Sequence, residues 1–437
     1  MIKKLVLVFV AFITIQSYAQ QGTASPYSFY GIGSLKFKGT VENRSMGGLS
    51  IYMDSIHMNL RNPASYATEN LASIPFNGES RPIKYTVGGS QTSLNLKSAT
   101  TSDKASSTTF DYLAVSIPIG KFGMGFSLMP QTSVGYKLET TDSNGHIIDR
   151  FKGEGGLNKV NLGIGYLLAK GLSIGIDANY NFGNIQNSVV EFAYDSDGII
   201  LQNQSKENNR SDLSGLSFNL GLSFKRKVND KYEFVSGFTY TPESNLTSNN
   251  IRTISTIVIN SATGSEYVSN SFESDLESMG LKQTDLTMPS KMSIGAGFGK
   301  PRAWFVGAEY STQKTSKFFN PLYSSITTKY EDASNISFGG FFIPQYNSFS
   351  GYFKRVVYRA GLHYEKTGLN INNESINEFG ISFGLGLPVG DFFSNANIGI
   401  EIGKRGTTNN NLIQENFVNF QLSLSLNDRW FQKRKYD

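Results

Sequence analysis

The chain of 437 residues contains no cysteine, only two tryptophans and only three histidines. The lack of cysteine excludes disulfide bonds and thiolate metal sites. No two of the histidines (His57, His146 and His363) stand at a spacing typical of a metal site. The net charge is only +5, with basic residues scattered among acidic ones, which gives no support for nucleic-acid binding. We therefore expect a protein without cofactors and without a nucleic-acid partner.

The sequence also lacks a long apolar run, apart from a short one at its start. Lys3 and Lys4 precede the apolar stretch 5–15, and Ser17-Tyr18-Ala19 has the small-x-small pattern of a cleavage site. Residues 1–19 are therefore predicted to be a secretory signal peptide, with the mature chain starting at Gln20. The alternative is a membrane anchor, but an apolar core of eleven residues is too short to span a bilayer.

What the sequence does contain is a series of segments that alternate apolar and small polar residues. Three of the clearest are 216–224, 379–387 and 418–426. Side chains alternate between the two faces of a strand, so each segment has one apolar face and one face of Gly, Ser, Asn or Gln. The mean hydropathy of −0.25 resembles that of a soluble protein. A membrane barrel gives such an average, because only every second residue of its strands must be apolar.

Fourteen candidate strands follow one another from about Arg81, and their connections alternate between short and long. Tight turns on one side and long loops on the other are typical of an outer-membrane barrel with an even number of strands. A soluble solenoid or sandwich is the alternative, but neither requires this alternation. We therefore predict an all-β fold, a 14-stranded antiparallel transmembrane β-barrel at 81–427, followed by a basic and aromatic periplasmic tail at 428–437. The predicted strands lie near 81–96, 108–119, 122–139, 155–168, 172–191, 212–226, 232–242, 288–299, 303–317, 333–345, 355–371, 376–389, 395–405 and 416–427.

Residues 20–80 do not alternate, and their motifs resemble those of a known family. Gly31-x-Gly33 is followed by a paired glycine, then by Asp54, then by an Asn-Pro-Ala motif. This order resembles the N-terminal hatch of the FadL/TodX family of outer-membrane transporters for hydrophobic compounds. The segments 288–297 and 304–310 also resemble the central strand pair of that family. The resemblance implies a hatch or plug at 20–80 inside the barrel lumen, with the motif residues Gly47, Gly48, Asn62, Pro63 and Ala64.

The resemblance also implies passive uptake of long-chain fatty acids or other hydrophobic small molecules across the outer membrane of a Gram-negative bacterium. Aromatic and apolar residues of the hatch could line a dry pocket, although they serve equally well as packing within a plug. Burial of apolar area would then drive capture of the ligand. The candidate pocket residues are Tyr27, Phe29, Tyr30, Leu49, Ile51 and Tyr52.

An alternative function is that of an accessory subunit of a secretion or protein-assembly complex in the outer membrane. The long connection 243–287 contains an alternating segment, 251–259, which predicts a hairpin that rises above the membrane and contacts a partner. The expected partners are thus outer-membrane lipid, a hydrophobic small molecule and, under this alternative, other outer-membrane proteins. Serine is so common that a Ser–His pair near His363 carries little signal, and we predict that the protein is not an enzyme.

Overall fold

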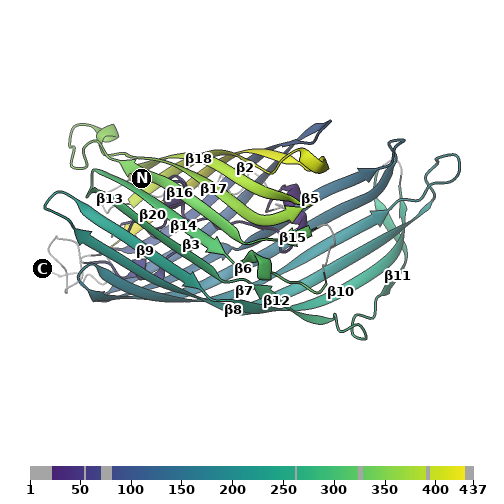
Figure 1. The fold of residues 1–437 in the computed structure, drawn as a ribbon, viewed down its shortest axis with the longest axis horizontal. Coiled ribbons are helices and arrows are strands. Elements are labelled where there is room, and N and C mark those ends of the chain that lie inside the picture. The colour runs from purple at the N-terminus through teal and green to yellow at the C-terminus, as the bar shows by residue number, and fades with distance from the viewer. Residues whose placement is uncertain are drawn as a thin grey trace, which may run out of the picture.

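The computed structural model describes residues 22–53, 56–69, 81–260, 263–322, 328–389 and 394–428. The predicted signal peptide, most of the predicted tail, Asp54 and residues 70–80 lie outside this part of the chain. All the strands belong to one sheet, and its last strand, β20, pairs antiparallel with β2 along their whole length. This pairing closes the sheet into a barrel (Figure 1). Among the described residues, no helix is both long and apolar enough to cross a membrane.

The barrel wall contains fourteen antiparallel strands, as the sequence predicts, and three of them are interrupted. Each interrupted strand carries two labels because a break divides it. The wall strands in order are β2 (Ile83–Lys97), β3 (Ser102–Ile119), β4 with β5 (Phe122–Pro130 and Thr132–Thr141), β6 (Ile147–Ala169), β7 (Leu172–Glu191), β8 (Asn203–Lys227), β9 with β10 (Glu233–Thr241 and Ser244–Ile259), β12 with β13 (Gln283–Met288 and Lys291–Lys300), β14 (Trp304–Gln313), β16 (Ala333–Phe342), β17 (Val357–Ile371), β18 (Glu374–Val389), β19 (Ser394–Arg405) and β20 (Gln414–Asp428).

The wall is apolar outside and polar inside, which is the reverse of a soluble protein. On β18, Phe379, Ile381 and Phe383 are exposed on the outer face, whereas Ser382 is buried on the inner face. The same alternation runs along β20, where Phe420 is exposed and Gln421 is buried. An outer surface of this kind is stable in hydrocarbon, and the pairing of β2 with β20 joins the first and last strands of the sheet.

The two ends of the barrel differ because one end has short turns and the other carries an extension of the sheet. Two residues, Gly120 and Lys121, separate β3 from β4, and two separate β6 from β7. At the opposite end, β6, β7 and β8 continue for 23, 20 and 25 residues in total, against 10 for β14 and 10 for β16. We call this projecting part the distal sheet; it lies on the right in Figure 1.

Much of the distal sheet falls in segments that the sequence analysis treated as connections. The first residues of β8 are polar on both faces, and the three large apolar or aromatic residues of β11 (Glu266–Glu273) are not regularly spaced, so neither segment shows apolar alternation. The alternating segment 251–259 is part of β10, and its antiparallel pairing with β11 confirms the predicted hairpin. β15 (Thr328–Tyr330) pairs with the end of β17 beyond β16, and the short turns η3 (Thr315–Lys317), η4 (Tyr352–Lys354) and η5 (Asn409–Asn411) lie in connections between wall strands.

Candidate functional site

The N-terminal segment, which we define as the described residues between 22 and 69, lies against the inner face of the barrel. It contains η1 (Pro26–Phe29), β1 (Ser34–Leu35), α2 (Val41–Arg44) and η2 (Pro63–Tyr66). These elements contact strands from several parts of the wall: η1 contacts β5, η2 contacts β6, β7 and β8, and α2 contacts β18, β19 and β20. The segment is therefore held from many sides at once.

Small residues on the inner face of the wall make room for this segment. Gly361 on β17 approaches the backbone of Met46 and Gly47 so closely that a Cβ atom at position 361 would overlap it. Gly47 itself has a φ of +70°, and a Cβ there would lie 2.5 Å from the carbonyl oxygen of Leu362. Glycine at these two positions thus allows the backbone of the segment to lie directly against the backbone of the wall.

We expect Gly361→Val to lower the free energy of unfolding by about 1–3 kcal/mol, because the added side chain overlaps the segment backbone and forces it to move. The measurement is a denaturant titration of the folded barrel in detergent. Ala360→Val is the matched control, because Ala360 is the next residue on β17 and faces outwards. Equal stability of the two variants would contradict the close fit at Gly361.

The five motif residues of the predicted hatch fall at two places on the wall. Gly47 and Gly48 form the turn after α2, where the Gly47 N–H donates to Ser382 Oγ at 2.9 Å. Asn62 caps η2, because its Oδ1 accepts from the Ala64 N–H at 3.0 Å and its Nδ2 donates to the Leu222 carbonyl at 3.1 Å. Pro63 and Ala64 are fully buried next to Gly175 of β7. These residues fasten the segment to β18 and to β7 and β8, respectively.

The six candidate pocket residues do not share one cavity. Tyr27 and Tyr30 line the central chamber described below. Phe29 packs edge-on against Tyr136 and Phe151 of the distal sheet. The other three residues are part of a separate apolar cluster: Leu49 and Ile51 are buried there with Phe305 and Phe341, and the ring of Tyr52 lies 4.8 Å from each of those two rings.

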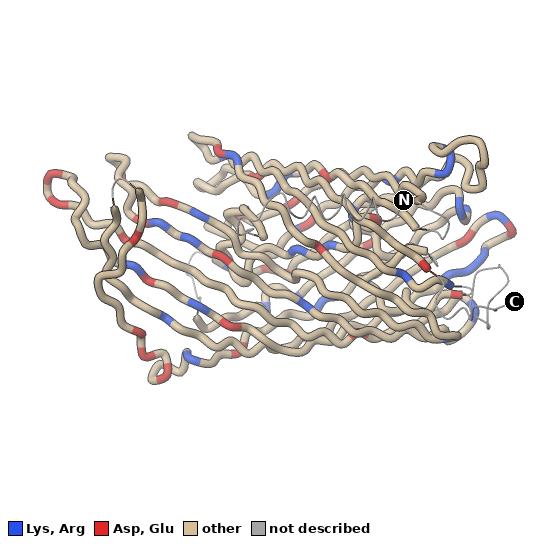
Figure 2. The backbone as a smooth tube through the Cα atoms, turned by 180° about the vertical axis from the view of Figure 1, so that it is seen from behind, with Lys and Arg blue, Asp and Glu red and all other residues tan. Residues whose placement is uncertain are grey.

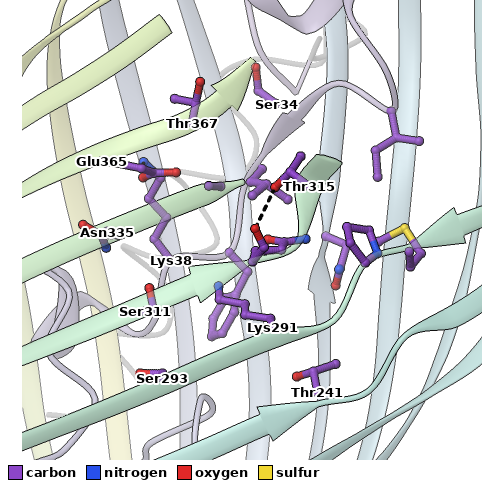
Figure 3. A pocket seen from close by; sticks show the side chains of 18 of the residues that line it. Ser34, Lys38, Thr241, Lys291, Ser293, Ser311, Thr315, Asn335, Glu365 and Thr367 are labelled. Atoms are coloured by element: carbon purple, nitrogen blue, oxygen red, sulfur yellow. Dashed lines mark hydrogen bonds and ion pairs between the residues drawn. The ribbon is translucent and has the colours of Figure 1, made fainter. Parts of the chain in front are cut away.

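The central chamber has a volume of about 370 Å³ and lies between the N-terminal segment and the wall. One part of its lining is aromatic and the rest is mostly polar. Tyr30, Phe318 and Tyr330 form an aromatic patch, in which the rings of Phe318 and Tyr330 are 4.9 Å apart. The remaining surface is mostly polar, and Figure 3 shows Lys38 and Lys291 among the side chains that project into it.

Lys159 and Lys291 differ from the other cations of the chamber, such as Lys38, in their lack of ion pairs among the described residues. Lys38 donates to Glu365 at 3.3 Å and to Glu378 at 2.5 Å. Lys159 on β6 and Lys291 on β13 form no ion pair within the part of the chain that the structure describes, and Lys159 instead lies 6.0 Å from the Phe37 ring. Two cations without a carboxylate partner, next to an aromatic patch, can accommodate the anionic group of an amphipathic molecule.

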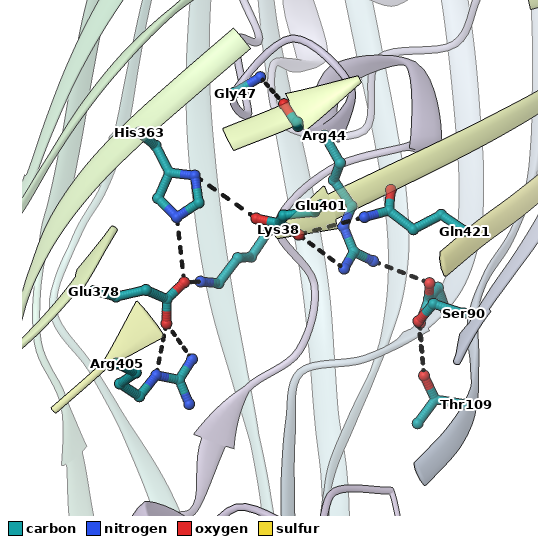
Figure 4. Close-up of polar contacts among 12 residues, drawn as sticks. Lys38, Arg44, Gly47, Ser90, Thr109, His363, Glu378, Glu401, Arg405 and Gln421 are labelled. Carbon is teal, nitrogen blue, oxygen red and sulfur yellow. Dashed lines mark hydrogen bonds and ion pairs between the residues drawn. The ribbon is translucent and has the colours of Figure 1, made fainter. Parts of the chain in front are cut away.

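Buried ion pairs connect the N-terminal segment to the wall below the chamber (Figure 4). Glu378 of β18 accepts from Lys38, from Nε of Arg405 at 2.6 Å and from His363 at 3.2 Å. Arg44 of α2 bonds Asp111 of β3 at 3.0 Å. A further pair joins Arg61 to Glu309 of β14 at 2.9 Å, and the Ser50 hydroxyl also donates to Glu309. The carboxylate of each pair is almost fully buried, so losing its cation would leave a costly unpaired charge.

The barrel wall has a gap between β3 and β5. β3 pairs with β4 only over Leu113–Ile119, and within the described residues Ser102–Tyr112 has strand partners on β2 alone. The edge of β5 that faces away from β6 pairs instead with β1 of the N-terminal segment, through Ser34↔Ser133 and Leu35↔Thr132. β1 therefore occupies the position that β3 would hold in an uninterrupted wall.

A β-bulge and the chamber both lie next to this gap. The pairing of β2 with β3 shifts register at Gly88 and Gly89, which leaves Asp111 unpaired in the ladder and turned towards Arg44. Leu35 and Gln131 line the chamber, and the Leu35 side chain is 44% exposed. The two residues of β1, Ser34 and Leu35, thus line the chamber and pair with β5 at this gap.

Sequence reasoning did not identify the charged residues of this site. Asp111, Asp177, Glu309 and Glu401 stand at inner-face positions between apolar or aromatic neighbours, and Glu378 stands at an inner-face position between Asn377 and Phe379. A charge at such a position is the signal that marks them, because an inward charge requires a partner inside the lumen. No group of three or more His, Cys, Asp or Glu side chains in the described ranges is arranged to hold a metal ion.

The comparisons with known proteins agree with this architecture. A sequence model of the BamG family matches residues 1–437. No curated protein matches the chain. Among solved structures, the toluene transporter TodX of Pseudomonas putida is 14% identical with a TM-score of 0.58, and the alignment covers 91% of this chain and 100% of TodX. The toluene transporter TbuX of Ralstonia pickettii is 13% identical with a TM-score of 0.57, covering 90% of this chain and 99% of TbuX.

A FadL homologue of Pseudomonas aeruginosa is similar to the same extent, with 12% identity, a TM-score of 0.56, and coverage of 91% of this chain and 100% of the homologue. Identities this low establish a shared fold and nothing more specific. The architecture implied by the resemblance to FadL and TodX is therefore confirmed at the level of the barrel. The chain belongs to the BamG family and has the barrel fold of FadL- and TodX-type channels.

Proposed function

We propose that this protein lies in the outer membrane and admits hydrophobic or amphipathic small molecules into its central chamber. The observation that carries the proposal is the gap between β3 and β5, next to which β1 pairs with β5 and lines the chamber. In this proposal the N-terminal segment is a hatch, and β1 is the part of it that closes the gap.

The arrangement of the chamber favours a sideways exit over passage straight through the barrel. The ion pairs of Glu378 and Glu309 and the apolar cluster around Ile51 fasten the N-terminal segment to the wall, which opposes passage straight through the lumen. At the gap, β1 is held by two residue pairs with β5 and by the Lys36 N–H, which donates to the Gln131 carbonyl at 3.0 Å, so little backbone pairing must be lost for β1 to move. Phe110 and Leu113 are exposed on β3 beside the opening. A molecule that leaves there enters hydrocarbon directly.

A long-chain fatty acid fits the divided lining of the chamber. Its alkyl chain would lie against Tyr30, Phe318 and Tyr330, and burial of apolar area there contributes roughly 25 cal/mol per Å². Its carboxylate would be placed near Lys159 and Lys291, the two chamber cations that form no ion pair with any described residue. The chamber volume of about 370 Å³ is within the range of small-molecule sites.

We expect the double variant Lys159→Gln/Lys291→Gln to bind oleate about 10- to 100-fold more weakly, because hydrogen bonds to a charged group contribute about 1.5–3 kcal/mol. Affinity is measured by titration calorimetry in detergent, with methyl oleate as the neutral comparison ligand. Lys354→Gln is the matched control, because Lys354 is exposed and outside the chamber. The proposal fails if the unaltered protein binds neither ligand, or if the double variant loses both ligands equally.

A second candidate function, an accessory subunit of an outer-membrane complex, is supported by the polar and charged character of the lumen. The carboxylates and cations that hold the segment in place suit a permanently closed barrel as well as a gated one. Mass spectrometry of the gently solubilised protein separates the two functions. Bound fatty acid without partner proteins would exclude the subunit function, whereas partners at fixed stoichiometry without any ligand would exclude transport.

A further inference from the structure

The distal sheet ends at a strand with an open edge. β10 pairs with β8 on one side along 247–258, and on its other side it pairs with β12 near the wall and with β11 farther out. Within the described part of the chain, β11 pairs with β10 alone. The second edge of β11 therefore presents a row of backbone N–H and C=O groups without a strand partner (Figure 1, lower right).

The composition of β11 leaves this edge available. All eight residues of β11 are exposed. Proteins commonly protect an edge strand with lysine or proline, and β11 contains neither. Its three large side chains are instead apolar or aromatic: Tyr267, Val268 and Phe272 are 61%, 63% and 59% exposed.

A bulge within the hairpin places the two aromatic side chains on one face. Tyr267 and Phe272 are five positions apart, which in a regular strand would direct them to opposite faces. The register with β10 shifts between Thr256 and Ile257, so Tyr267 stands opposite Val258 and Phe272 stands opposite Ile254. Ile254 with Phe272 and Val258 with Tyr267 therefore form two apolar cross-strand pairs on one face, with Thr256 and Asn270 between them; we call these two pairs the apolar patch.

The charges around the edge define which partner it suits. Glu266 pairs with Lys206, but Glu273 and Asp275 form no ion pair within the described residues. Asp275 accepts from the backbone N–H of Ser278, which lowers the pKa of its carboxyl group and keeps it anionic. Acidic residues are visible at the tips of the distal sheet in Figure 2, on the left.

These charges disfavour a second copy of the chain as the occupant of the edge. Two β11 strands related by a two-fold axis through the middle of the strand would place Glu266 of each copy opposite Glu273 of the other. Like charges directly opposite each other destabilise a strand pair. A strand with apolar side chains between basic ones would instead satisfy the backbone edge, the apolar patch and the carboxylates together.

We propose that the open edge of β11 is a docking site for an extended segment of another protein, which adds a strand to the distal sheet and carries lysine or arginine on both sides of an apolar centre. The backbone hydrogen bonds supply affinity, and the apolar patch and the carboxylates supply selectivity. Outer-membrane barrels have their short turns in the periplasm, so this site faces the cell exterior. The inference is independent of whether the chamber transports small molecules.

The test uses the full-length protein in detergent and three synthetic peptides. The first has the sequence Lys-Arg-Val-Thr-Val-Thr-Val-Arg-Lys, the second replaces its four basic residues with glutamate, and the third replaces the central valine with proline. Fluorescence anisotropy should show that the basic peptide binds, that the acidic peptide binds at least about tenfold more weakly, and that the proline peptide does not bind, because proline removes a backbone donor. Hydrogen exchange at 266–273 should slow only with the basic peptide.

The charge-reversal variant Glu273→Lys/Asp275→Lys should exchange this preference, binding the acidic peptide more tightly than the basic one. Asp195→Lys/Asp197→Lys is the matched control, because it reverses two exposed carboxylates on a different loop of the distal sheet. The proposal is overturned if no peptide binds, if the control changes the preference equally, or if slowed exchange at 266–273 accompanies self-association of the protein without peptide.

Discussion

A disulfide between β1 and β5 is expected to stop release of a fatty acid from the chamber. Ser34 and Ser133 stand directly opposite each other in the antiparallel pairing, where Cα atoms are about 4.5–5.5 Å apart, a separation that a disulfide can bridge. The chain has no native cysteine, so Ser34→Cys/Ser133→Cys creates the only disulfide in the molecule. Because β1 must leave β5 to open the gap, oxidation should slow uptake of a fluorescent fatty acid into proteoliposomes by about tenfold or more.

Reduction of this variant should restore uptake. A folding defect would persist after reduction, so recovery shows that the disulfide itself blocks release. Asn370→Cys/Ser375→Cys is the matched control, because these residues are also directly opposite each other, at the end of the β17–β18 hairpin and away from the gap. Oleate binding by the oxidised variant should remain, since the chamber lysines are unchanged. If the oxidised protein transports as fast as the reduced one, the exit does not pass between β1 and β5.

The transmembrane part of the fold could be predicted because the membrane imposes a strict pattern on it. At 379–387 and 418–426, hydrocarbon outside and polar groups inside require opposite residue types at successive positions, and that requirement is readable from one sequence. The constraint ends where the membrane ends. Residues 102–107 of β3 and 203–211 of β8 form strands in water, with polar side chains on both faces, and their sequence resembles that of a loop.

The connections inside the lumen could not be predicted, because they join residues far apart in the chain. Lys38 and Glu378 are separated by 340 positions, and neither stands in a pattern that identifies the other. The irregular backbone of the N-terminal segment has no period to detect. Its glycines and its Asn62-Pro63 turn could be recognised as unusual, but which strands they contact depends on the closed barrel.

The gap and the buried ion pairs together determine which part of the N-terminal segment can move. The Arg44–Asp111 pair lies beside the bulge, so the segment is anchored next to the one part of the wall where β3 lacks a second neighbour. Farther along, β1 is held by two residue pairs with β5 and by the Lys36 N–H. Strong anchoring of α2 beside weak anchoring of β1 permits a local movement of β1 while the rest of the segment stays in place, so opening does not require the lumen to empty.

The strongest of these anchors can be tested by removing its central carboxylate. Glu378→Leu leaves Lys38, His363 and Arg405 without their shared partner in a buried site, and removing one member of a buried ion pair costs about 3–5 kcal/mol. We expect the wall of this variant to form, because each strand keeps its backbone pairing. The N-terminal segment should loosen, since Lys38 then has only Glu365 to pair with.

Limited proteolysis reports separately on the N-terminal segment and on the barrel wall. Folded barrels resist protease, so Glu378→Leu should release fragments of the N-terminal segment while the wall remains intact, and denaturant should unfold the variant at a lower concentration. Glu374→Leu is the matched control, because Glu374 lies on the same strand at its exposed end. Adding Lys38→Met to Glu378→Leu removes one of the unpaired cations and should recover part of the lost stability. An intact segment in Glu378→Leu would mean that the glycine contacts hold it without the ion pairs.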